Sequence, residues 1–280
     1  MYDGPSLLAP AMGDGALRKS DSKERTVANP SPRPPKAAVP SSIVDGDGNP
    51  IHNHILLGIP PAERERLIPK LELQHQRTHH VLHQPGASVK SAYFCDTGLV
   101  SILSVLPDGR SVEVGLIGNE GFVGVPLLAG FRTSPTRAIA QISGTVFRID
   151  AEALIVLLPA CPILERKLQQ FAQIAAMQVT QLAACNRLHD VNERLARWLL
   201  MSADRIDSLL LPLTQEFLGQ MLGARRSSVT VAAGALAKAG LITYNRGDVK
   251  ILDRPGLEES ACECYGIMVR QVEEWEGQRK

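Results

Sequence analysis

Long hydrophobic runs are absent from this sequence of 280 residues. No stretch approaches the run of about 18 apolar residues that identifies a membrane-spanning helix, and the N-terminus lacks the compact apolar segment of a secretory signal peptide. The five cysteines are scattered and odd in number, which favours a reducing compartment over a disulfide framework. We therefore expect a cytoplasmic protein that has no membrane partner.

Net charge is nearly absent as well, because 30 Lys and Arg residues oppose 29 Asp and Glu residues for a formal charge of +1. The chain as a whole therefore carries no nucleic-acid signature. The charge is uneven, however, since six basic residues oppose two acidic ones between Gly223 and Arg254. A basic patch on one module can bind phosphates even when the whole protein is nearly neutral.

Patterns typical of enzymes are lacking too. The sequence shows no Ser/His/Asp order, no phosphate-binding loop and no paired catalytic carboxylates. Cys262 and Cys264 form a Cys-x-Cys pair, but zinc ribbons need two separated Cys-x2-Cys pairs. We interpret them as small buried apolar residues on the last helix. No catalytic residue, cofactor or metal ligand is assigned.

The first 50 residues hold eight of the 19 prolines, many Ser and Gly residues, and no periodic apolar pattern. Such a composition predicts a disordered tail. A recognition role for its densest proline stretch, residues 31–35, is the alternative.

Many short strands are predicted after a helical pattern at residues 54–69. Leu99–Leu106 and Ser111–Ile117 alternate well enough for an antiparallel pair, and Ala138–Ile149 suggests another pair of strands around Ser143-Gly144. Short strands at this spacing are typical of a sandwich or jelly roll.

A long helical pattern follows, from Pro162 to about Arg187. Its apolar positions step by alternating four and three residues, which is a heptad seam and favours a homodimer. A single helix packed on its own domain is the alternative. Asp190 is then the expected N-cap of a fresh helix at 191–202. The seam positions are Leu164, Leu168, Phe171, Ala175, Gln178, Leu182 and Cys185.

Residues 214–241 carry the most informative pattern, two short helices joined at Gly223, where a tight turn needs a residue that tolerates positive φ. The second helix opens with polar and basic side chains that can reach bases and phosphates when a helix N-terminus enters the major groove. A hairpin over 242–252 follows. This segment predicts binding to double-stranded DNA. The positions expected to be buried in a helix-turn-helix are Leu218, Leu222, Ala224, Val229 and Ala232.

The order of a small β-barrel, a long helix and a winged helix-turn-helix resembles the Crp–Fnr superfamily of bacterial transcription regulators over about residues 50–270. The strongest matching segments are 99–103, 108–124 and the helix-turn-helix itself. The resemblance implies an α+β fold with an N-terminal jelly-roll (double-stranded β-helix) domain. It also implies a homodimer whose recognition helices enter successive major grooves, and it makes RNA polymerase a candidate partner. The expected organisation is a tail (1–50), a cyclic-nucleotide-binding-like sensor barrel (51–160), a dimerisation helix (161–190) and a winged helix-turn-helix domain (191–280).

The resemblance also bears on the effector. Cyclic-AMP-binding members hold the ribose with a glutamate just after the glycine that matches Gly124, and here that position is Val125. Their Arg-Ser pair on the cyclic phosphate corresponds here to Thr136-Arg137. An apolar side chain cannot replace charge-assisted hydrogen bonds, so we expect an effector other than cyclic AMP, sensed at these four positions. No cysteine precedes Cys95, which excludes the N-terminal iron–sulfur cluster of the oxygen-sensing members.

The DNA-reading positions differ from those of the best-known members, which carry Arg followed by Glu. Here these positions are Arg226 and Ser227, so an arginine able to bind guanine remains while the acceptor for cytosine is lost. Arg225 is expected on a phosphate. Thr214 is expected to cap the first helix and to donate to a phosphate, and capping alone is the alternative. The predicted DNA contacts are Thr214, Arg225, Arg226, Ser227, Ser228, Thr230 and, on the wing, Arg246 and Lys250.

A rival hypothesis from another class depends on a histidine cluster within residues 75–83, which is similar to the His-rich strand of metal-dependent cupin enzymes. No acidic residue lies within the cluster and Pro85-Gly86 follows at once, so exposed histidines are the favoured interpretation. The effector, the operator and the direction of regulation stay open. The cluster consists of His75, His79, His80 and His83.

Overall fold

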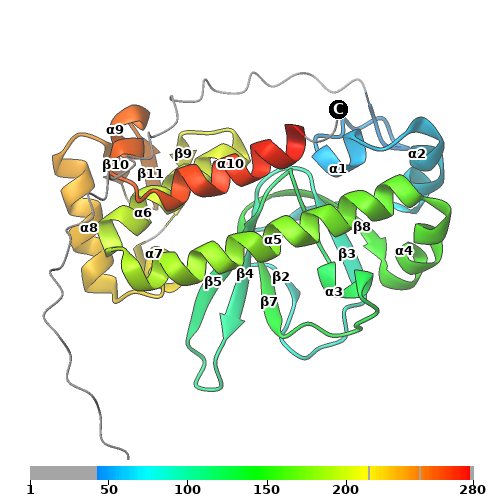
Figure 1. Cartoon of the computed structure of the whole chain (residues 1–280), viewed down its shortest axis with the longest axis horizontal. Helices are drawn as coiled ribbons and strands as arrows, with labels where there is room; N and C mark the ends of the chain where they lie inside the picture. Colours follow the sequence, from blue (N-terminus) through cyan, green and yellow to red (C-terminus); the bar gives the residue numbers. More distant parts are fainter. Residues whose placement is uncertain (1–42, 214, 246, 278–280) are drawn as a thin grey trace, which may run out of the picture.

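The structure, a computed structural model, describes residues 43–213, 215–245 and 247–277. Its parts follow one another in space as they do in the sequence: a β-barrel, a long helix that crosses it, and a C-terminal helical domain (Figure 1). The predicted fold class is confirmed: an α+β protein with an N-terminal β-barrel, a long helix and a C-terminal helix-turn-helix. A disordered tail is predicted for residues 1–50, and residues 1–42 lie outside the described part of the chain.

The described chain enters the barrel before residue 50, the predicted end of the tail. Val44 and Pro50 form an isolated β-bridge, and the Ile51 side chain is fully buried in the barrel core. Helix α1 (His54–Leu57) begins at the N-cap Asn53, whose side chain accepts from the first backbone N–H groups. Helix α2 (Pro61–Leu67) begins with a proline, which suits the first turn, and a 3-10 turn at Ile68–Lys70 follows.

Two four-stranded sheets make the barrel, in the orders β1-β8-β3-β6 and β2-β7-β4-β5. Most neighbouring strands are far apart in sequence, which is the jelly-roll arrangement that was predicted. Apolar side chains from both sheets pack between them, Phe94 and Phe147 from one sheet and Val100 from the other. The strands are β1 (Glu72–Gln76), β2 (Val81–His83), β3 (Ser91–Cys95), β4 (Leu99–Val105), β5 (Ser111–Ile117), β6 (Phe122–Val123), β7 (Thr136–Ile142) and β8 (Gly144–Asp150).

Of the two predicted strand pairs, one is confirmed and one is wrong. Strands β4 and β5 pair antiparallel as expected. Strands β7 and β8 both exist, but they belong to different sheets, because the chain crosses from one sheet to the other at Ser143. Gly144 allows this corner, since a Cβ there would lie 2.3 Å from the Thr97 carbonyl oxygen. A hairpin and a sheet-crossing corner share the same local signal, a glycine between two alternating segments.

Helix α5 (Pro162–Leu188) confirms the predicted long helix but not the predicted dimer seam. Leu164, Leu168 and Phe171 pack into the barrel core of their own chain, and Gln178 and Cys185 are buried further along. Heptad spacing is shared by a helix that faces a partner and one that lies on its own domain. The second interpretation therefore holds for these residues, and a homodimer needs another face of α5.

The C-terminal domain begins at Asp190, whose side chain and that of Glu193 form a capping box around the start of α6. Leu195, Trp198 and Leu199 are buried, as predicted. The helix-turn-helix and a three-stranded sheet follow. The bounds are α6 (Val191–Ile206), β9 (Leu210–Leu211), α7 (Gln215–Leu222), α8 (Arg226–Lys238), β10 (Ile242–Asn245), β11 (Asp248–Ile251), α9 (Arg254–Glu259) and α10 (Cys264–Gly277); α3 (Val125–Leu128) and α4 (Ala151–Leu157) flank the barrel.

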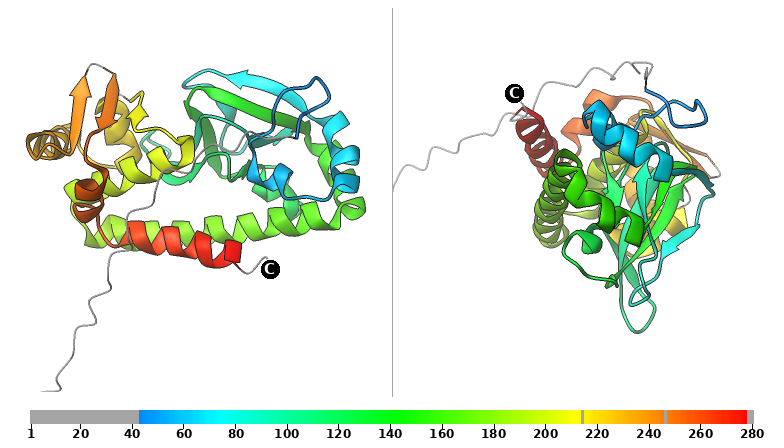
Figure 2. Two further views of the ribbon diagram at one scale, coloured as in Figure 1. Left: turned by 90° about the horizontal axis from the view of Figure 1, so that it is seen from above. Right: turned by 90° about the vertical axis from the view of Figure 1, so that its right-hand side faces the viewer.

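The C-terminal domain shares a core with the barrel. One hydrophobic cluster joins Leu99, Leu103 and Leu116 of the barrel to the buried residues of α6, α7 and α8. Helix α10 then runs back along α5, so the last described element lies beside the long helix (Figure 2). Among the helices in the described part of the chain, none combines the length and the apolar character needed to cross a bilayer.

Candidate DNA-binding surface and effector pocket

The turn of the helix-turn-helix has the predicted geometry. Gly223 adopts φ +57°, a left-handed conformation that favours glycine, between α7 and α8. The positions expected to be apolar and inward are buried at Leu218, Leu222, Val229 and Ala232, and half-buried at Ala224. The helices therefore meet through the residues that the sequence indicated.

The start of α8 is an exposed, basic helix end. Arg225, Arg226, Ser227 and Thr230 are exposed, and Ser228 is half-buried. Arg225 occupies the N-cap position without a side-chain hydrogen bond to the helix. The first backbone N–H groups of α8 thus lack a side-chain cap from that residue, and such groups at a helix N-terminus are donors for phosphate oxygens.

The wing is the predicted hairpin. Strands β10 and β11 pair antiparallel, Gly247 at the turn has φ +91°, and β9 adds a third strand. Lys250 on β11 is exposed. Thr214 and Arg246 lie outside the described residues.

The helix-turn-helix rests against the barrel through α7. Gln220 Nε2 donates to Ser111 Oγ on β5 over 2.6 Å, and the rings of Phe217 and His79 are 5.6 Å apart. At Gly223 an added Cβ would lie 2.9 Å from Val112 Cγ2, so the turn itself approaches the barrel closely. The DNA-binding elements are therefore held by strand β5 as well as by their own core.

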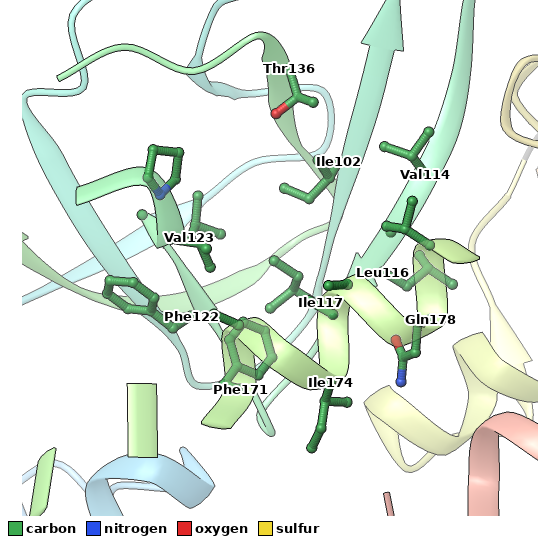
Figure 3. A pocket seen from close by; sticks show the side chains of 18 of the residues that line it. Ile102, Val114, Leu116, Ile117, Phe122, Val123, Thr136, Phe171, Ile174 and Gln178 are labelled. Atoms are coloured by element: carbon green, nitrogen blue, oxygen red, sulfur yellow. The ribbon is translucent and has the colours of Figure 1, made fainter. Parts of the chain in front are cut away.

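A cavity of about 500 Å³ lies between the barrel and α5 (Figure 3). Its wall is mostly apolar, and α5 contributes Phe171 and Ile174 to it. Volume and lining are typical of a site for a small molecule. Apolar residues from the strands that line it include Ile102, Val114, Leu116, Ile117, Phe122 and Val123.

Three of the four predicted effector residues line this cavity: Gly124, Val125 and Thr136. Arg137 is not among the lining residues, and its Nε donates to Gln84 Oε1 over 2.8 Å. The reason is the alternation of side chains along β7, which places neighbours on opposite faces. The arginine that would meet a cyclic phosphate therefore points away from the cavity.

Few polar side chains reach the cavity. His83 is one of them: its ring nitrogens are buried, and burial lowers the pKa of this histidine. The sequence pattern indicates His83 only as part of a possible metal cluster. The other polar or charged lining residues are His54, Ser104, Glu120, Ser134, Thr136, Lys167 and Gln178.

The cavity wall is linked directly to the C-terminal domain. Glu120 lines the cavity and accepts a 2.9 Å hydrogen bond from Arg205 Nε of α6. Arg205 also donates to the Leu116 carbonyl oxygen and, over 3.4 Å, to Gln178 Oε1. One arginine of the C-terminal domain thus donates to three residues of the cavity wall. No local sequence pattern predicts this link, because the residues that form it are far apart in the chain.

The histidine cluster does not form a metal site. His75 is exposed on β1, His79 lies beside Phe217, and His83 lines the cavity. Within the described residues, a single group of ligand-bearing side chains converges closely enough for a metal, and it contains none of these histidines.

Two family models match this chain, one in the barrel and one in the C-terminal domain. Residues 73–160 match the family model for the cyclic nucleotide-binding domain, and residues 193–260 match that for the Crp-like helix-turn-helix domain. The transcriptional regulatory protein Btr of Bordetella pertussis is 26% identical over 133 residues, which cover 42% of this chain and 55% of Btr. The chain thus aligns with about half the length of that relative.

Solved structures share the fold. FixK2 of Bradyrhizobium japonicum superposes with a TM-score of 0.60 at 18% identity, covering 69% of this chain and 98% of FixK2. A Crp/Fnr-family protein of Eubacterium rectale superposes with a TM-score of 0.58 at 16% identity, covering 74% of this chain and 96% of that protein. At such identities the likeness establishes the fold alone.

Proposed function

The chain belongs to the Crp–Fnr superfamily of bacterial transcription regulators, and on that premise we propose that it is a homodimeric, sequence-specific DNA-binding regulator. The observation that carries this proposal is the exposed start of α8, where Arg225 and Arg226 flank a helix N-terminus without a side-chain cap from Arg225. Arg226 is the proposed base reader and Arg225 the proposed phosphate contact. Ser227, Ser228, Thr230 and Lys250 add further polar groups, and the proposal extends to Thr214 and Arg246.

The test compares two neighbouring arginines. DNA fragments selected from genomic DNA by the purified protein supply the operator. Arg226→Ala should lose about 1–3 kcal/mol of discrimination between the operator and mismatched DNA. Arg225→Ala should weaken binding to all sequences alike. It should also reduce the magnitude of the slope of log affinity against log salt concentration by about 1, as expected for the loss of one phosphate contact. Arg132→Ala, an exposed arginine on the barrel, is the matched control. Equal discrimination by the Arg226→Ala variant and the unaltered protein would refute the proposal.

We propose that the dimer forms through the exposed face of α5. Ala176, Thr180 and Ala183 follow one another at spacings of four and three and are exposed, as are Met177 and Ala184. Residues at these spacings share one side of a helix, and small side chains let two helices approach closely. In a dimer formed through this face, the two recognition helices would bind half-sites about 34 Å apart.

The effector we propose is a small, largely apolar molecule bound in the cavity beside α5, at Gly124, Val125 and Thr136. The apolar wall supports this choice, and so does the direction of Arg137, whose guanidinium binds Gln84 outside the cavity. Occupancy would act on the domain boundary through Glu120 and Gln178, because both line the cavity and both bind Arg205 of α6. Couplings of this kind are typically worth about 1–3 kcal/mol.

A further inference from the structure

Three cysteines and a histidine from two distant parts of the chain meet beside the start of α6. Cys185 lies in the last turn of α5, and His189 is the C-cap residue of that helix, four positions later. Cys262 and Cys264 precede and begin α10, which returns along α5. The four side chains offer three sulfurs and one ring nitrogen, and these atoms all lie within 4.8 Å of one another.

Two of the distances between these atoms are close to the edges of a coordination tetrahedron. The Sγ atoms of Cys185 and Cys262 are 3.5 Å apart, and Cys264 Sγ lies 3.6 Å from His189 Nδ1. In tetrahedral zinc sites, Zn–S bonds of about 2.3 Å and Zn–N bonds of about 2.0–2.1 Å separate two sulfurs by about 3.8 Å and a sulfur from a nitrogen by about 3.6 Å. We propose that these four side chains bind one zinc ion in a closed Cys₃His site.

The groups around the four side chains have the arrangement expected of an outer coordination shell. His189 presents Nδ1 to the sulfurs, while its Nε2 lies 3.1 Å from the Glu263 carboxylate. A carboxylate on the far nitrogen fixes the tautomer that leaves the near nitrogen free to bind a metal. Gln181 Nε2 donates to Cys264 Sγ over 3.1 Å, as N–H groups do to metal-bound thiolates.

The negative charge of such a site would balance charge on two arginines that are buried on α6. Arg194 and Arg197 have exposed fractions of only 8% and 3%, and the Nε atom of each has no hydrogen-bond partner among the described residues. Electrostatic interactions link both arginines to the cysteine sulfurs. A buried cation requires a compensating anion. Zn²⁺ with three thiolates and a neutral imidazole carries one negative charge, which would offset part of the positive charge of the two arginines.

The site would clamp two elements that meet at the boundary of the domains. Cys185 and His189 end the long helix immediately before the N-cap Asp190 of α6, and Cys262 and Cys264 start the helix that lies along α5. Metal binding would thus hold α10 on α5 and fix the exit of the chain into the DNA-binding domain. This goes beyond the proposed function and does not depend on it, because the site is separate from the cavity and from the exposed end of α8.

The test measures metal binding by the full chain. Protein purified under reducing conditions should contain about one zinc per chain. After chelation, added Co²⁺ should produce the absorption of a tetrahedral cobalt–thiolate centre, which Zn²⁺ then removes. Cys262→Ser and His189→Gln should abolish or alter this spectrum, whereas Cys161→Ser, which removes a buried cysteine of the barrel core, should leave it unchanged.

A variant next to the four ligands distinguishes weaker metal binding from loss of the fold. Glu263 is exposed, so Glu263→Gln should fold normally yet bind Co²⁺ about 10–100-fold more weakly. Chelation of the unaltered protein should also lower its melting temperature, and zinc should restore it. The proposal is overturned if the reduced protein holds no zinc and gives no cobalt–thiolate spectrum. It is equally overturned if that spectrum persists unchanged in the Cys262→Ser variant.

Discussion

Trp198 Nε1 donates a 2.8 Å hydrogen bond to Glu113 Oε1, joining α6 of the C-terminal domain to β5 of the barrel. Both side chains are buried, and Ser101 Oγ donates to the other carboxylate oxygen over 2.7 Å. Burial raises the pKa of Glu113 to about 7, although the two hydrogen bonds act in the opposite direction. A titratable group therefore sits in the core that the two domains share.

Stability should depend on pH through this carboxyl. Its folded pKa of about 7 lies above the ordinary value of 4.5, so between these values the folded protein binds more protons than the unfolded one. The free energy of unfolding should thus fall as pH rises through this window, by roughly 3 kcal/mol at most. Glu113→Gln mimics the protonated form and should remove this loss.

Denaturant unfolding at pH 5 and pH 8 measures this effect. The variant should gain stability relative to the unaltered protein at the higher pH, and Glu65→Gln, an exposed glutamate on α2, serves as the control. A Glu113→Gln variant that is equally destabilised at both values would disprove the assignment.

The turn of the helix-turn-helix should tolerate no side chain. Gly223→Ala places a Cβ on a residue with φ +57° and brings it to 2.9 Å from Val112 Cγ2. The left-handed conformation alone costs about 1–2 kcal/mol for a non-glycine residue, and the contact with β5 adds to that cost. Gly234→Ala is the matched control, because Gly234 lies within α8 with nothing within 4 Å of its added Cβ. Since alanine is the better helix former by about 1 kcal/mol, that variant should be stabilised in thermal unfolding. The opposite ranking would contradict the described turn.

Dimerisation should respond to a charge on the exposed face of α5. Ala183→Glu introduces two carboxylates at a helix contact that two copies of the chain share, and like charges brought together without compensation are unfavourable. Sedimentation equilibrium should show a monomer for this variant and a dimer for the unaltered protein. Ala87→Glu, at an exposed loop residue of the barrel, should remain dimeric. A dimer that survives in the Ala183→Glu variant would place the interface elsewhere.

The cavity should bind an apolar dye, and a larger side chain that fills the cavity should weaken this binding. Ile174 lines it from α5 with a side chain that is 8% exposed, and Ile174→Trp should occupy much of the space. An apolar fluorescent dye such as Nile red should bind the unaltered protein and bind the variant at least about tenfold more weakly, a loss of about 1.4 kcal/mol. Cyclic AMP should not displace the dye, because the Arg137 guanidinium points away from the cavity. Displacement by cyclic AMP at the same site would overturn the proposed effector class.

Much of the fold could be predicted because its signals are local. The turn at Gly223, the N-cap at Asp190 and the β4–β5 pair each depend on residues within a few positions of one another, and all three are confirmed. The surface of α8 was likewise evident from its sequence, since a run of Arg and Ser at a helix start has few ways to be buried.

The amino-acid sequence by itself thus determined the elements, their order and the exposed basic end of α8, because caps, turns and periodicity act over a few residues. Only the tertiary structure decided which face of α5 is covered, that β7 and β8 belong to different sheets, and that the Arg137 side chain lies outside the cavity. It also brought Cys185 to Cys262, 77 residues away in sequence. Such neighbours are chosen by the packing of whole layers, and no local preference of either residue encodes that choice.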